Sequence, residues 1–133
     1  MGRKTISFVV KGEPASKANS RRKVTNRNTG KPMFIKSAKA VGYAESFALQ
    51  CPKIPDIFTG DVEVEVVIYY GSRRPDLDES LILDGMQGRV YVNDRQVKVR
   101  HTWWALDTRD PRAEIRVSSL DHLGVPDLLN HKA

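Results

Sequence analysis

The chain has 133 residues, a length that one domain can occupy, and 40% of them are hydrophobic, which suffices for a small core. A net charge of +6 and a pI near 9.6 favour a polyanionic partner, and no apolar run approaches the roughly 18 residues that a membrane span requires. The single cysteine, Cys51, excludes an internal disulfide and a cysteine-based zinc site.

The basic charge is concentrated near the N-terminus. Residues 1–40 contain eleven Lys or Arg and one acid, whereas the rest of the chain contains eleven basic and fifteen acidic residues. A field of this kind favours nucleic acid, and a basic surface kept for solubility is the alternative. The first residues lack an apolar segment with a cleavage site, so we expect no secretory signal and a cytoplasmic location.

The first predicted element is a strand over residues 5–11, where apolar and polar side chains alternate. Residues 15–36 form a basic arm with little periodicity, which we expect to be a polar loop. Such a loop is consistent with a phosphate-contacting arm that becomes ordered on binding DNA, or with a dispensable loop.

Further along the chain, Ser37 is expected to cap a helix that runs to about residue 50. Strands are expected over residues 62–70, 95–104 and 113–117, and a short helix over 80–86. Trp103 and Trp104 would lie on opposite faces of their strand, so one of them should be buried. Residues 119–133 are expected to form a short helix or a mobile tail. This pattern predicts an α+β fold in one domain over residues 1–133.

An acidic cluster follows the strand over residues 62–70, in the sequence Arg73-Arg74-Pro75-Asp76-Leu77-Asp78-Glu79. In an extended chain Asp76 and Asp78 would point to the same side while Leu77 turns into the core. Two close carboxylates raise the pKa of each other, and a bound cation such as Mg²⁺ removes that repulsion. A solvated acidic turn balanced by arginines is the alternative.

Several motifs together resemble the RusA family of Holliday junction resolvases. They are the segment Gly12–Lys17 followed by Arg21-Arg22, the pair Asp76-Leu77-Asp78, the run Leu83–Tyr91, the segment Asn93–Val97, and Asp110-Pro111-Arg112. Their order and most of their spacing match the family over about residues 5–118.

The resemblance implies a homodimeric, Mg²⁺-dependent endonuclease that resolves four-way DNA junctions in recombination and repair, without a small-molecule cofactor. It also implies a mixed four-stranded sheet packed with two helices. The catalytic and metal-binding residues would be Asp76, Asp78 and Asp94, with Glu79 as a candidate extra ligand. The DNA-backbone contacts would come from Lys17, Arg21, Arg22, Arg73 and Arg74.

The sequence departs from the family pattern at the acidic cluster. Glu79 replaces the family's asparagine, and Asn93 replaces the first residue of an Asp-Asp pair. The segment after Glu79 is about two residues short and lacks a lysine that family members usually need for cleavage, so Lys17, Lys98 or an arginine would have to replace it. The alternatives to the endonuclease are therefore a junction-binding protein with impaired or no cleavage, and a basic structural or RNA-binding protein.

Overall fold

The computed structural model describes residues 3–16 and 21–129. Two α-helices, a 3-10 helix and six strands occur in these residues. In chain order they are β1 (Thr5–Lys11), β2 (Arg21–Thr25), β3 (Pro32–Lys36), α1 (Ala38–Gln50), β4 (Val62–Tyr70), α2 (Ser80–Gly85), the 3-10 helix η2 (Asp94–Gln96), β5 (Val97–Leu106) and β6 (Arg112–Ser119).

The main sheet has four strands in the order β1-β6-β4-β5. β6 pairs antiparallel with both β1 and β4, whereas β4 and β5 are parallel and are connected through α2 and η2. A parallel pair needs such a crossover because a tight turn cannot join its strands. The predicted α+β fold, with a mixed four-stranded sheet and two helices, is confirmed.

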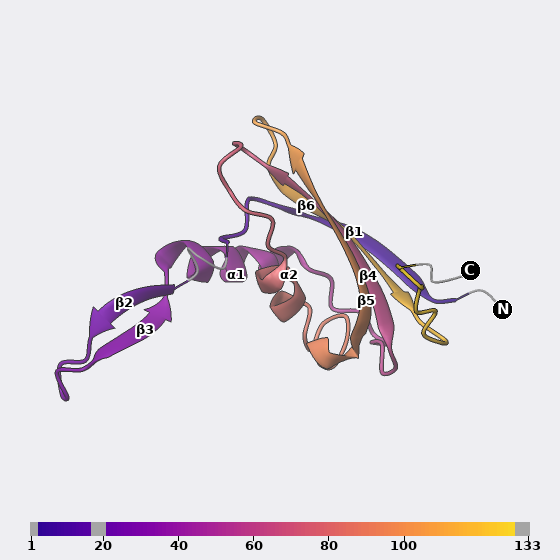
Figure 1. Cartoon of the computed structure of the whole chain (residues 1–133), viewed down its shortest axis with the longest axis horizontal. Helices are drawn as coiled ribbons and strands as arrows, with labels where there is room; N and C mark the ends of the chain where they lie inside the picture. Colours follow the sequence, from indigo (N-terminus) through magenta and orange to yellow (C-terminus); the bar gives the residue numbers. More distant parts are fainter. Residues whose placement is uncertain (1–2, 17–20, 130–133) are drawn as a thin grey trace.

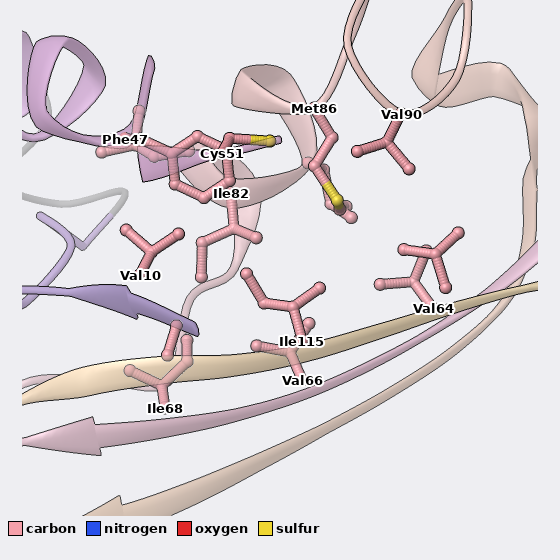
Figure 2. Close-up of a cluster of buried hydrophobic side chains, with 14 of the residues drawn as sticks. Val10, Phe47, Cys51, Val64, Val66, Ile68, Ile82, Met86, Val90 and Ile115 are labelled. Atoms are coloured by element: carbon pink, nitrogen blue, oxygen red, sulfur yellow. The ribbon is translucent and has the colours of Figure 1, made fainter. Parts of the chain in front are cut away.

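The core lies between one face of this sheet and the two helices, which lie on the same side of it (Figures 1 and 2). Every second residue of β4, from Val62 to Tyr70, is fully buried, as its alternation predicted. The side chains of Phe47 from α1 and Ile82 from α2 meet this strand from the helical layer (Figure 2). Among the residues that the structure describes, no helix lies on the opposite face of the sheet (Figure 1).

Helix α1 begins and ends where its sequence predicts. The Ser37 side chain accepts a hydrogen bond from the Ala40 backbone N–H, which is the predicted cap. The helix ends at Cys51, whose thiol is buried, and this burial raises its pKa to about 11. A thiol with so high a pKa is a poor nucleophile at neutral pH, so Cys51 has a packing role.

The basic arm differs from the expected loop, because residues 21–36 form a hairpin. β2 and β3 pair antiparallel from Arg21 opposite Lys36 to Thr25 opposite Pro32. Its turn is closed by Asn26, whose side-chain oxygen accepts from the backbone N–H groups of residues 28 and 29, and by Gly30 in the left-handed region at φ 70°. The prediction failed because a strand is recognised from alternating apolar and polar residues. Lysines and arginines occupy several positions of β2 and β3, so that alternation is not visible in the sequence.

β5 begins two residues later than predicted, and the alternation of its side chains between the two faces of the sheet is interrupted near its start. Its register against β4 shifts so that Val62 pairs with Val97 but Glu63 pairs with Val99, which leaves Lys98 as an extra residue. After this bulge the even-numbered residues face the helices. Trp104 therefore packs against the core while Trp103 is 49% exposed, as expected for a pair in which one tryptophan is buried.

The C-terminal segment over residues 121–129 is irregular, with bends at residues 121–122 and 128–129, so the described part of the tail contains no helix. In the parts of the chain that the structure covers, no helix combines the length and apolar character needed to span a membrane.

Replacing Gly85 with alanine is expected to destabilise the fold by about 1–3 kcal/mol, the usual cost of overpacking a core. A Cβ at this position would lie 2.4 Å from Cδ1 of Phe47, whose ring is fully buried and has little room to move. Urea unfolding followed by circular dichroism would measure the free energy of unfolding. Gly42→Ala in α1 is the matched control: nothing lies within 4 Å of its Cβ position, and we expect stabilisation by about 0.5–1 kcal/mol. Equal effects of the two substitutions would contradict the packing argument.

Candidate active site

The loop between β4 and α2 is anchored to the sheet through Tyr70, the last residue of β4. The Tyr70 hydroxyl donates to the backbone carbonyl of Asp76 at 3.1 Å and accepts from the backbone N–H of Asp78 at 3.2 Å. Its ring stacks on Trp104 with centroids 5.6 Å apart, and the Trp104 indole N–H donates to the carbonyl of Pro75 at 3.0 Å. Burial raises the pKa of Tyr70, so its phenol stays protonated and able to donate. Two aromatic side chains thus hold the backbone of the acidic loop.

The Tyr70 hydroxyl holds the backbone on either side of Leu77, through the carbonyl of Asp76 and the N–H of Asp78. Leu77 is 39% exposed, and its predicted place in the core is wrong. Asp76 is exposed and Asp78 is half-buried.

Asp78 and Glu79 lead into α2. Oδ1 of Asp78 accepts from the backbone N–H of Ser80 at 2.9 Å, which satisfies a donor at the start of the helix. Glu79 is largely buried, and its Oε1 lies 3.3 Å from Nε of Arg100 on β5. The Glu79 carboxylate is therefore paired with a cation from β5, the strand beside β4.

Asp94 lies at the first position of η2, before β5. Asn93 caps this turn, and Asn93 and Gln96 form a capping box in which each side chain accepts a hydrogen bond from the other residue's backbone N–H. Oε1 of Gln96 accepts from the Asn93 backbone N–H at 2.9 Å, while its Nε2 donates to the carbonyls of Phe58 and Gly60, each at 2.8 Å. This network places Asp94 by fixing the backbone rather than by contacting the carboxylate.

A cavity of about 570 Å³ opens beside Asp94. Its lining residues are Leu83, Asp94, Arg95, Val97, Lys98 and Arg100. Arg100 is thus shared between this cavity and the ion pair with Glu79, so it connects the acidic loop to Asp94 along the edge strand β5. The bulge at Lys98 causes this arrangement, because without it Arg100 would face the opposite side of the sheet.

The carboxylates suit a magnesium ion in chemistry but do not form a ready cluster. Among the residues that the structure describes, no group of three or more His, Cys, Asp or Glu lies close enough to hold a metal. Mg²⁺ prefers hard oxygen ligands, commonly one or two carboxylates with water and phosphate completing the shell, and Asp76, Asp78 and Asp94 offer only such oxygens. Their metal-binding role, and that of Glu79, stays a prediction.

The predicted DNA-contacting residues lie in two segments. Arg73 and Arg74 are exposed in the loop after β4, and Arg22 is exposed on β2. Arg21 belongs to β2, and Lys17 lies outside the described residues.

Glu13 connects the chain that precedes the basic arm with the loop that follows β4. Its Oε1 accepts from the backbone N–H of Gly71 at 2.8 Å, and its Oε2 pairs with Lys39 of α1 at 3.1 Å. The chain that leads into the basic arm is therefore joined to the start of the loop that carries Arg73 and Asp76.

The family model described as Endodeoxyribonuclease RusA matches residues 12–118. The chain belongs to the RusA family. No curated protein matches it at the threshold of the search. The matched range includes the acidic loop, Asp94, the whole of β4 and β5, and all of β6 except its last residue. Members of the RusA family are endodeoxyribonucleases that act on branched DNA junctions, so this protein is assigned to the nuclease hydrolases.

Sequence reasoning missed four residues that build the candidate site of this RusA-family protein. They are Tyr70, Gln96, Arg100 and Trp104. Tyr70 and Trp104 were seen only as strand residues, because hydrogen bonds to distant backbone atoms leave no periodic signal. Gln96 had a signal, since a polar residue three positions after Asn93 is the spacing of a capping box.

Proposed function

We propose that this protein is a Mg²⁺-dependent endonuclease that cuts four-way DNA junctions in recombination and repair, in the cytoplasm and as a homodimer. The observation that supports it most is the position of Arg100, between the Glu79 carboxylate and the cavity beside Asp94. A cation and several carboxylates at one sheet edge are the groups that phosphodiester hydrolysis uses.

In this proposal Asp76, Asp78 and Asp94 hold the metal. A metal held there would supply Lewis acidity toward the phosphate. Tyr70 keeps the loop backbone in place, so that less ordering is needed when the ion and the DNA arrive. Arg100 stabilises negative charge that develops on the phosphate, which is the role left open by the missing lysine. Arg22, Arg73 and Arg74, with Lys17 and Arg21, contact the DNA backbone, and phosphate contacts of this kind position the duplex.

The helix-free face of the sheet supports the homodimer. It carries an open, mainly apolar hollow of about 530 Å³ lined by Val9, Val67 and Trp103 among others. Glu65 and Arg116 also line this hollow, and they form a bidentate ion pair with N–O distances of 2.8 and 2.7 Å. A second copy placed against this face would bury the exposed tryptophan, and two sites in one dimer would allow paired cuts.

A second candidate function is junction binding without efficient cleavage. It is favoured by the ion pair of Arg100 with Glu79, because an arginine engaged by a carboxylate has less charge to offer a phosphate. This candidate keeps the DNA contacts of the basic segments and predicts salt-sensitive binding.

Incubation with a labelled synthetic four-way junction, in Mg²⁺ and in EDTA, tests both candidates. Symmetric paired nicks that require Mg²⁺ are expected for the endonuclease. A junction that is shifted in a native gel but never cut would favour the binding protein. A junction that is neither bound nor cut would rule out both.

A further inference from the structure

The β2–β3 hairpin extends away from the four-stranded sheet, beyond the N-terminal end of α1 (Figure 1). Its sequence from residue 21 to residue 36 contains six Lys or Arg and no acid. Because all its charges have one sign, no ion pair can form within the hairpin itself, which favours an anionic ligand.

One face of this hairpin combines lysines with an exposed aromatic ring. Cross-strand partners share a face, and Lys23 pairs directly with Phe34. Lys36 lies two residues after Phe34 on the same strand and therefore on the same face. All three residues are exposed, and Phe34 is 66% exposed. The opposite face holds Val24 and Met33, which pair with each other.

A flat apolar ring between two cations fits one component of a polyanion, the nucleobase. Aromatic side chains stack on bases whose faces are open, while neighbouring lysines neutralise the phosphates on either side. Base faces inside a continuous duplex are already covered by their neighbours. At the branch point of a junction the stack is interrupted, so a base face is accessible there.

We infer that Phe34 stacks on a nucleobase at the branch point, with Lys23 and Lys36 on the adjacent phosphates. This inference rests on the proposed function and adds the means by which a junction is distinguished from a linear duplex. The hairpin contacts phosphates through its lysines in any DNA, but its aromatic contact forms only where stacking is broken.

The test measures binding of the full chain in EDTA to a fluorescent four-way junction and to a linear duplex of the same length. Phe34→Ala is expected to weaken junction binding by about 5- to 100-fold, the usual loss for one base–aromatic stack, and to leave duplex binding nearly unchanged. Phe34→Tyr is expected to restore junction binding, because its ring stacks equally well.

Two control variants separate stacking from charge and from fold. Met33→Ala removes an apolar side chain that is 41% exposed on the other face of the hairpin, and it is expected to bind both DNAs as the unchanged protein does. Lys23→Gln is expected to weaken binding to both DNAs and to reduce the slope of log K against log salt by about 1. Phe34→Ala should leave that slope unchanged.

The outcomes distinguish this inference from the proposed function. If the unchanged protein prefers the junction and Phe34→Ala binds it equally well, the stacking inference is overturned and the proposed function stands. If the unchanged protein shows no preference for the junction, the proposed function fails and the inference with it. If Phe34→Ala instead converts a dimer to a monomer in analytical ultracentrifugation, the ring contacts a second copy of the chain, which also overturns the inference.

Discussion

Asp78→Asn is expected to reduce cleavage of a four-way junction by about 10³-fold or more while the protein still folds and binds DNA. Loss of a metal ligand removes several kcal/mol of charge stabilisation at the phosphate, and each 1.4 kcal/mol is about tenfold in rate. The fold should survive because the asparagine Oδ1 can accept the hydrogen bond that Ser80 N–H donates to Asp78. Single-turnover cleavage in Mg²⁺ measures the rate, and calorimetric titration with Mg²⁺ measures metal binding separately.

Asp121→Asn is the matched control, since Asp121 is an exposed carboxylate in the C-terminal segment, away from the acidic loop. It removes the same charge and should leave cleavage and metal binding unchanged. Junction affinity of Asp78→Asn in EDTA should be equal to or tighter than that of the unchanged protein, because a negative charge near the phosphate has been removed. Normal cleavage by Asp78→Asn would remove this residue from the site.

Arg100→Ala is expected to lower cleavage by about 10²- to 10³-fold, the usual effect of removing one group that stabilises transition-state charge. The guanidinium lies 3.3 Å from Glu79 and lines the cavity beside Asp94, so it contacts both parts of the candidate site. Arg100→Lys keeps the charge but loses the planar fork, and we expect it to retain part of the activity. The measurement is the single-turnover rate at saturating protein, with junction affinity determined in EDTA.

Arg95→Ala provides the comparison for Arg100, because Arg95 lines the same cavity and carries the same charge. Its Nε is directed to the Asn93 side chain at 3.4 Å rather than to the acidic loop. A general loss of positive potential would weaken DNA binding by similar factors in both variants, whereas a catalytic role predicts a selective fall in rate for Arg100→Ala. If Lys98→Ala alone lost activity, the lysine on the bulge would be the cation that matters.

The contact of Arg100 with the acidic loop bears on the lysine that the shortened segment lacks. The chain after Glu79 enters α2 at once, so this segment offers no lysine to the acidic loop. The parallel strand β5 supplies a cation instead, from a position that lies beside Val64 in the sheet. The backbone position of Arg100 is fixed by the hydrogen bonds between β4 and β5.

Local patterns predicted the elements that form the core. The alternation from Val62 to Tyr70 matches the buried face of β4 because a strand repeats every two residues, and this period is independent of what packs on it. The capping residue Ser37 and the helix after it were predicted for the same reason, since a cap acts within three residues.

The hairpin shows where local patterns fail. Lys23 and Phe34 face each other across β2 and β3. Both faces of this two-stranded element are largely exposed, so it contains few apolar residues whose two-residue spacing would indicate a strand. Its turn chemistry, with Asn26 and Gly30, was the signal that could have revealed it.

The sequence by itself determined the α+β class, the buried face of β4, the position of α1 and, through its ordered motifs, the resemblance to the RusA family. Only the tertiary structure decided that Tyr70 anchors the acidic loop and that β5 has a bulge at Lys98. Because of this bulge, Arg100 joins Glu79 to the cavity beside Asp94. The physical reason is the range of the interactions. Periodicity and caps act over a few residues, whereas strand register and hydrogen bonds between distant segments depend on how the whole sheet is assembled.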